Sequence, residues 1–232
     1  MGNIIPSPII IEFYGLPGAG KTTVSRRLQQ RLLEMGLASV TMYYRNIFHR
    51  KSQSLLFAPR YWKIIKASSS YAKLLSKRCK AFRILSMIRF VRMYRHFVSD
   101  KPADCLVVEQ GFFQAMISIA NFERLPESDK LTNLLELIDL NSLPLLLVKC
   151  NVSDETANER VLSRPLKGKG CRVEKLTDEE RIKAFSVQSY NFSFLRENMN
   201  RLYCSVDEVE IDTEKPVESN VDIILNHILQ QK

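Results

Sequence analysis

The residues with the clearest chemical signature form the pattern G-x-x-x-x-G-K-T near the start of the chain. Glycines at the first, fourth and sixth positions let the backbone bend around a polyphosphate, with its amide hydrogens pointing inward. The lysine can reach the β- and γ-phosphates of a nucleotide, and the threonine hydroxyl can bind Mg²⁺. The pattern predicts a phosphate-binding P-loop, whose residues are Gly15, Leu16, Pro17, Gly18, Ala19, Gly20, Lys21, Thr22 and Thr23.

A carboxylate follows a later apolar run, Cys105 to Val108, as the first residue of Glu109-Gln110-Gly111. A carboxylate just past a buried strand can hold Mg²⁺ or a Mg²⁺-bound water, or it can take a proton from an acceptor hydroxyl. Beside the P-loop, we therefore expect Glu109 to serve as catalytic residue and metal ligand, with Thr22 as the second protein ligand.

Two arginines, Arg160 and Arg164, occur four residues apart in a segment that starts near Ser153 with a helix-capping pattern. On a helix this spacing puts both guanidinium groups on one face. A cationic, glycine-containing stretch follows, and Thr177 starts a second capped helix. The pattern predicts a short lid over residues 164–176 that closes over phosphates and excludes water.

Strands and helices alternate around these residues, which predicts a parallel sheet covered on both faces. The expected strands are 9–14, 38–43, 105–109, 145–150 and 209–212, and the expected helices are 23–33, about 131–140, one from Ser153 and 217–229. In such sheets ligands bind beyond the carboxyl ends of the strands, which is where the P-loop lies. The 232 residues predict one domain, 1–232.

Charge is unevenly distributed in a chain whose net charge is +9. Between Glu34 and Asp100 there is no acidic residue, while Lys and Arg occur fourteen times. Three interpretations stay open for this basic segment, 44–101: a pocket for a phosphorylated acceptor, a surface for nucleic acid or an anionic membrane (within 44–95), or a merely solvated face. A helix with apolar residues from Ile84 to Val98 is predicted inside it.

Five scattered cysteines without a C-x-x-C pair predict reduced thiols and no zinc site. No stretch has the length and apolarity of a signal peptide or a membrane span. These features lead us to expect a cytoplasmic protein.

The order of P-loop, acidic end of the third strand, arginine-rich lid and polar turn after the last strand resembles the P-loop nucleoside and nucleotide kinases. It is most similar to thymidylate kinases, with a glutamate after the third strand as in deoxynucleoside kinases. Where those families carry Asp-Arg or Glu-Arg-Ser, this chain has Glu109-Gln110-Gly111.

The resemblance implies a three-layer α/β/α fold with a five-stranded parallel sheet, ATP and Mg²⁺ as the donor, and a possible homodimer. It implies that Lys21 and the P-loop amides bind the phosphates and that Arg160 and Arg164 stabilise the transferring phosphoryl. It also implies that the turn at residues 212–216, Lys215 included, contacts adenine.

Two functions follow from the sequence. The first is transfer of the γ-phosphoryl of Mg-ATP to a small, anionic acceptor such as a nucleoside monophosphate. The second is a P-loop NTPase that acts as a switch, or on nucleic acid or membrane surfaces, without a small acceptor. A GTPase switch is disfavoured because the chain has no Asn-Lys-x-Asp motif.

Overall fold

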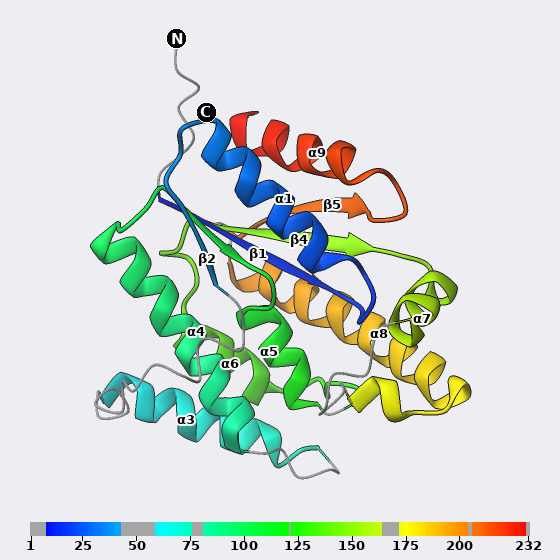
Figure 1. Ribbon diagram of the computed structural model, residues 1–232. Coiled ribbons are helices and arrows are strands. Elements are labelled where there is room, and N and C mark those ends of the chain that lie inside the picture. Colours follow the sequence, from blue (N-terminus) through cyan, green and yellow to red (C-terminus); the bar gives the residue numbers. More distant parts are fainter. Residues whose placement is uncertain are drawn as a thin grey trace.

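Five parallel strands form one sheet in the order β2-β3-β1-β4-β5 in this computed structural model (Figure 1). The structure describes residues 8–42, 59–75, 81–120, 122–163, 172–203 and 206–230. The strands are β1 (Ile9–Gly15), β2 (Ser39–Met42), β3 (Cys105–Val108), β4 (Leu145–Asn151) and β5 (Asp207–Asp212). All five predicted strands are present, and the expected α/β class with a parallel sheet is confirmed.

The central strand β1 pairs with β3 on one side and β4 on the other, so every one of its residues is buried. A strand with neighbours on both edges and helices on both faces has no solvent-facing side, which is why β1 reads as a continuous apolar run. Glu12 is the exception in that run, because it is an ionisable residue with no exposed surface. No role for this glutamate was predicted from the sequence.

Helices cover both faces of the sheet and create the expected three layers. Helices α1 and α9 lie on one face, and α4, α5, α6 and α8 lie on the other, with α3 packed outside α4 and α6 (Figure 1). Their bounds are α1 (Lys21–Glu34), α3 (Pro59–Ala72), α4 (Ala81–Asp100), α5 (Phe112–Ile119), α6 (Asp129–Ile138), α7 (Asp154–Leu162), α8 (Asp178–Leu202) and α9 (Val217–Gln230), with a 3₁₀ turn at Arg172–Lys175.

The basic segment supplies α3 and α4, which confirms its helical character for the part that the structure describes. The apolar side chains predicted to share one face of α4 are buried as far as Tyr94, while Val98 near the end of the helix is half-buried. Arg89 and His96 are exposed on another face. Residues 44–58 and 76–80 of this segment lie outside the described residues.

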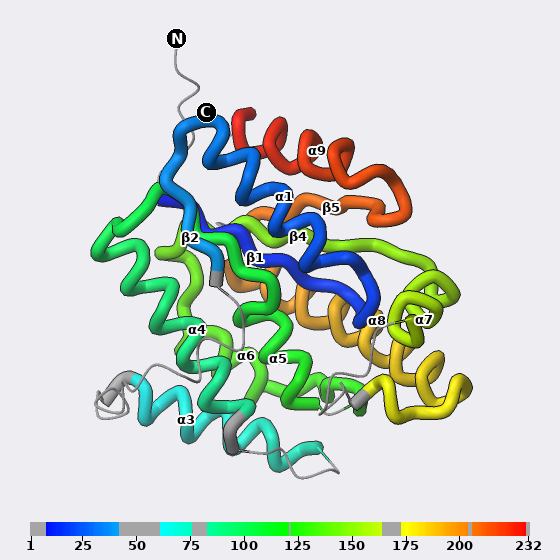
Figure 2. The backbone as a smooth tube through the Cα atoms, viewed as in Figure 1, coloured from blue at the N-terminus to red at the C-terminus, as the bar shows by residue number. Residues whose placement is uncertain are grey.

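Helix α7, which precedes the predicted lid at 164–176, follows β4 and runs beside the P-loop (Figure 2). Ser153 caps α7 by accepting from the Thr156 amide, and Thr177 forms the predicted capping box with Glu180 at the start of α8. Helix α7 ends at Leu162, before Pro165. Arg164 and the rest of 164–171 lie outside the described residues.

Across the described ranges, every helix is too short or too polar to cross a lipid bilayer.

Candidate functional site

The P-loop connects β1 to α1 and forms the floor of a cavity of about 550 Å³. Its glycines at 15, 18 and 20 all have positive φ, a conformation that side chains with a Cβ rarely adopt. At Gly18 a Cβ would also lie 2.4 Å from the carbonyl oxygen of Ala157, because α7 packs directly on the loop. The loop is thus held in a tight bend at the N-terminus of α1, where the helix dipole favours anions.

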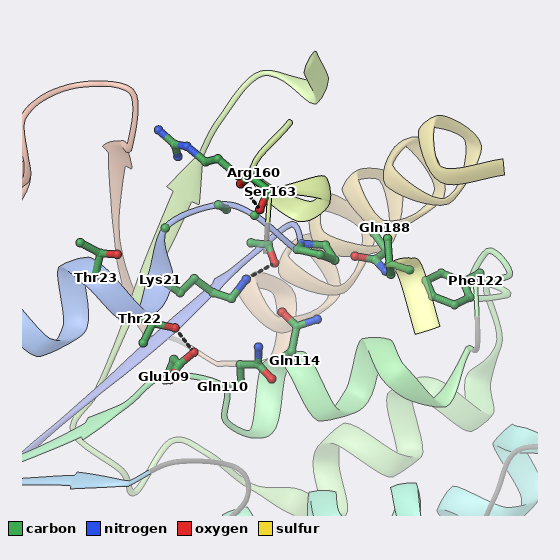
Figure 3. Close-up of a pocket in the computed structure, with 16 residues that line it drawn as sticks. Lys21, Thr22, Thr23, Glu109, Gln110, Gln114, Phe122, Arg160, Ser163 and Gln188 are labelled. Carbon is green, nitrogen blue, oxygen red and sulfur yellow. Dashed lines mark hydrogen bonds between the residues drawn. The ribbon is translucent and has the colours of Figure 1, made fainter. Parts of the chain in front are cut away.

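Lys21 is buried, and its ammonium group folds back over the loop. The Nζ atom donates to the carbonyl oxygens of Gly15, at 2.8 Å, and Leu16, at 2.7 Å. These contacts hold the positive charge at the mouth of the P-loop (Figure 3). A phosphate entering the loop would meet both the backbone amides and this charge.

Thr22 and Glu109 meet at the carboxyl end of the sheet, as the sequence analysis expected of a shared metal site. The Thr22 hydroxyl donates to Oε1 of Glu109 (Figure 3), although the two residues are 87 positions apart in the chain. A hydroxyl and a carboxylate are hard oxygen donors, and Mg²⁺ in nucleotide sites is held by one or two such groups together with phosphates and water. The pair therefore fits Mg²⁺. No cluster of three or more His, Cys, Asp or Glu side chains suited to a metal occurs among the described residues.

The turn after Glu109 is held from behind by a buried pair, Glu12 and Tyr94. One oxygen of Glu12 accepts from the amide of Phe113, at 2.7 Å, and the other accepts from the Tyr94 hydroxyl, at 2.7 Å. Gly111 fits closely against both, because a Cβ there would lie 2.0 Å from the Tyr94 hydroxyl oxygen and 2.5 Å from Cδ of Glu12. The pair thus fixes the turn that carries Glu109.

Burial raises the pKa of the Glu12 carboxyl from 4.5 to about 7, against the lowering effect of the Tyr94 hydroxyl and the α5 amides. The same burial, together with the Glu12 charge, raises the pKa of Tyr94 well above 10. Glu12 occupies the N-terminal amides of α5, where a bound anion would otherwise be favoured.

Arg160 lines the cavity on the side of the turn between β5 and α9. Its Nη2 atom donates to the Thr213 carbonyl oxygen at 3.0 Å, and Nη1 lies 3.4 Å from the Thr213 hydroxyl oxygen. In Figure 3 its guanidinium group extends away from Lys21. The structure thus brings Arg160 to the predicted adenine-contacting turn rather than beside Lys21.

Lys215, also predicted to bind the nucleotide, lies on that turn. Its side chain is 64% exposed, and its Nζ atom lies 3.8 Å from Oδ2 of Asp212. It does not line the cavity.

The other end of the cavity is lined by uncharged side chains from three elements. Gln110 follows β3, Gln114 belongs to α5, Gln188 belongs to α8, and the ring of Phe122 follows α5 (Figure 3). Gln114, Phe122 and Gln188 also line a smaller adjoining cavity of about 100 Å³, whose far wall includes Arg83. The P-loop and this amide-lined wall therefore belong to one continuous site.

Most of the described Lys and Arg side chains of the basic segment lie outside the cavity. Lys63 and Lys66 are exposed on α3, Lys73 is exposed just after its end, and Arg95 donates to the carbonyl oxygen of Ile138. Arg83, the one that lines a cavity among the described residues, donates to the Ser118 carbonyl oxygen. The binding of nucleic acid or a membrane through this segment stays a prediction, as does a homodimer.

Sequence reasoning missed four contributors to the site: Glu12, Gln114, Phe122 and Gln188. Glu12 carried a signal, an ionisable residue inside an apolar strand, because such a residue must find partners in the core. It also missed Arg181, a buried anchor of the lid that donates to the carbonyl oxygens of Val173 and Leu176 and to the side chains of Asn158 and Asp178.

Comparison with known proteins supports a kinase relationship for the P-loop half of the chain. Residues 7–120 match a family model described as adenylylsulphate kinase. An adenylyl-sulfate kinase from Staphylococcus carnosus (strain TM300) is 29% identical over 122 residues, which cover 52% of this chain. The chain spans 58% of the length of that curated relative.

Solved structures resemble the chain over nearly its whole length at low identity. A structure of deoxyadenosine kinase from M. mycoides, with dCMP and dCDP bound, covers 95% of this chain and 98% of its own at 17% identity, with a TM-score of 0.47. An uncharacterized protein from Eubacterium ventriosum ATCC 27560 covers the same shares at 12% identity, with a TM-score of 0.50. At this identity the Eubacterium ventriosum structure shows a shared fold and no more. The thymidylate kinase-like subtype stays a prediction.

Proposed function

We propose that this chain is an ATP-dependent phosphotransferase that moves the γ-phosphoryl of Mg-ATP to a small acceptor. The observation that carries the proposal is the convergence of three groups on one cavity. Lys21 lies at the phosphate loop, Thr22 and Glu109 pair beside it, and the same cavity continues past Gln110 to a second, uncharged end. A site that only hydrolysed ATP would need no such second compartment.

At the phosphate end, the P-loop amides and Lys21 would bind the β- and γ-phosphates and neutralise charge that develops as the bond breaks. Thr22 and Glu109 would hold Mg²⁺, which supplies further neutralisation of the phosphates when bound. Glu109 would also accept a proton if the acceptor presents a hydroxyl.

Arg160 and Arg164 are proposed to act with the lid over the bound nucleotide. Contact with Thr213 supports a position for Arg160 where the nucleotide's base and ribose enter the cavity. The buried Arg181 ties the start of α8 to the 3₁₀ turn and to α7, so these elements would move together in closure.

The acceptor is proposed to be anionic, such as a nucleoside monophosphate, as in thymidylate kinase-like enzymes. The fourteen cations between residues 35 and 99 support this charge. The name of the curated relative points the same way, because adenylyl sulfate is itself an anionic nucleotide. The matches to kinases do not favour the alternative, an NTPase switch without a small acceptor.

The proposal is tested by following phosphoryl transfer from γ-labelled ATP with nucleosides, nucleoside monophosphates and adenylyl sulfate as candidate acceptors. We expect slow ATP hydrolysis without acceptor and a phosphorylated product with at least one of them. Fast hydrolysis that no candidate acceptor changes would contradict the proposal and support the switch NTPase.

A further inference from the structure

Two buried amides on the same helix, α8, differ in one respect that points to a ligand. Asn191 is 1% exposed and Gln188 is 8% exposed, and they lie three residues apart. The Asn191 oxygen accepts from the Leu125 amide at 2.8 Å, and its nitrogen donates to the Glu123 carbonyl oxygen at 2.8 Å. The amide oxygen of Gln188 has no hydrogen-bond partner among the described residues.

Gln114 repeats this feature on the facing helix α5. Its amide oxygen is also withdrawn from water without a partner among the described residues. An unsatisfied buried polar group destabilises the folded state, because it has lost its hydrogen bonds to water without replacement. Both oxygens belong to side chains that line the two adjoining cavities, so a ligand that donates hydrogen bonds there would relieve both costs at once.

Phe122 completes this wall with an aromatic ring and a strained backbone. Its φ is +69°, a left-handed conformation that is uncommon and unfavourable for a bulky residue. The hydrogen bonds of Asn191 to Glu123 and Leu125 hold the loop immediately after it. The fold thus maintains a costly conformation that places the ring against both cavities.

The charge of this wall disfavours an anion at this point. Gln114, Phe122 and Gln188 are neutral, and the N-terminal amides of α5 already bind the Glu12 side chain. Arg83, which lines the smaller cavity, donates to the Ser118 carbonyl oxygen. A carboxamide offers one acceptor and two donors in a plane, which matches the edge of a nucleobase, and an aromatic ring offers a stacking surface.

We propose that Gln114, Gln188 and Phe122 form the recognition site for the nucleobase of the acceptor. This inference rests on the proposed function only where it calls the ligand an acceptor. The binding itself can be measured without any phosphoryl transfer. Amide pairing and stacking would select the base, and the phosphate of the acceptor would be bound elsewhere in the site.

The first test compares ligands by calorimetry with a non-hydrolysable ATP analogue present. The panel is the common nucleosides, their 5′-monophosphates, ribose 5-phosphate and deoxyribose 5-phosphate. We expect at least one base-containing ligand to bind about 10-fold or more tightly than either sugar phosphate. Equal binding of the sugar phosphates, or no binding of any base-containing ligand at millimolar concentration, would overturn the proposal.

The second test uses Gln188→Leu and Gln114→Leu, with Gln230→Leu at the exposed end of α9 as the matched control. Loss of one or two hydrogen bonds predicts about 5- to 100-fold weaker binding of the base-containing ligand. Binding of the ATP analogue should not change. The control should bind both ligands like the unmodified chain.

Melting temperature without ligand separates recognition from a structural role. Gln188→Leu removes an unsatisfied amide, so we expect it to melt at the same temperature or higher, whereas Asn191→Leu should melt lower because it breaks two satisfied hydrogen bonds. A Gln188→Leu variant that melts lower but binds normally would contradict the recognition site.

Transfer from γ-labelled ATP is measured on the same samples. If bases bind through these glutamines but no ligand is phosphorylated, the proposed function fails and the recognition site stands. If the protein phosphorylates a ligand without a base, and the glutamine variants do so at the normal rate, the function stands and the recognition site fails.

Discussion

The two ends of the cavity differ in how the chain forms them and in whether their buried polar groups have hydrogen-bond partners. At the phosphate end, the site is formed by one continuous segment, and Lys21 is held by carbonyl oxygens of its own loop. At the other end, the wall comes from two segments far apart in the chain, residues 110–122 and α8, and two of its amide oxygens have no partner among the described residues. Neighbouring residues of the chain define the geometry of the first end, and its buried lysine has hydrogen-bond partners. Packing of distant segments forms the second end, where we propose that a ligand supplies the missing hydrogen bonds.

Between the two ends stands the turn of Glu109 to Gly111, which belongs to both. Glu109 contacts Thr22 on the phosphate side, and Gln110 begins the uncharged side. Because Glu12 and Tyr94 support this turn from the core, a change in their packing should reach both ends. Substitutions at each end, and at the turn between them, should therefore distinguish the contribution of one half of the site from that of the other.

The largest effect is expected at the phosphate end. Lys21→Ala should lower phosphoryl transfer by about 10³- to 10⁵-fold, as loss of a cation that neutralises the transferring phosphoryl does in related chemistry. Circular dichroism should stay unchanged, and the thermal stabilisation by Mg-ATP should shrink. Activity within 10-fold of the unmodified chain would contradict the phosphate role of this lysine.

Glu109→Gln tests what the turn does for the acceptor. If the acceptor offers a hydroxyl, loss of the base should lower kcat by roughly 10²- to 10⁴-fold, and added Mg²⁺ should not restore it. If the acceptor is a phosphate monoester, which is largely dianionic above a pKa of about 6, no base is needed. Partial rescue by Mg²⁺ would then show that Glu109 acts only through the metal.

Glu12→Gln tests the support behind the turn through the pH dependence of stability. The unfolded chain ionises Glu12 near its ordinary pKa of 4.5, whereas the folded chain keeps it protonated to about pH 7. The folded state therefore holds the extra proton between these values. The contribution of this group to the free energy of unfolding is full below pH 4.5, declines by about 3 kcal/mol as pH rises to 7, and is then constant.

Urea unfolding at pH values from 4.5 to 8 measures this decline. Glu12→Gln should lack it, so the variant should gain stability relative to the unmodified chain as pH rises. Glu155→Gln, at an exposed position of α7, is the control and should keep the unmodified slope. Parallel curves for Glu12→Gln and the unmodified chain would show that the buried carboxyl does not titrate as described.

Gly111→Ala probes the close fit of the same turn. A methyl group there would meet the Tyr94 hydroxyl and the Glu12 carboxyl, and overpacking of this kind costs about 1–3 kcal/mol of stability. Tyr94→Phe in the same chain removes the nearest clashing atom and should restore part of the loss. If Gly111→Ala unfolds at the same urea concentration as the unmodified chain, the turn is not tightly held.

The smallest effect is expected for Arg160→Ala. The arginine is predicted from the family resemblance to act on the transferring phosphoryl, which would lower kcat. Its contact with the Thr213 turn instead favours nucleotide binding, with a rise of about 3- to 10-fold in the KM for ATP, the value of one lost hydrogen bond. Steady-state kinetics distinguishes the two roles, because a fall in kcat at unchanged KM supports the catalytic one.

The sequence by itself determined the phosphate end and the layered fold. The P-loop is a contiguous motif between an apolar strand and an amphipathic helix, so residue type and spacing define its geometry before any tertiary contact forms. The alternation of strands and helices likewise defined the parallel sheet, and both capped helices around the lid start where Ser153 and Thr177 indicated.

Only the tertiary structure decided the opposite end of the cavity. Gln114 and Gln188 are unremarkable on their own helices, and they become a wall because α5 and α8 pack together against the sheet. Glu12 is recognisable in sequence as an anomaly, but its partner Tyr94 lies 82 residues away. Net charge likewise counts side chains, and only packing decides which of them face the site. Local geometry is encoded by neighbours in the chain, whereas a composite wall depends on long-range packing that residue spacing does not specify.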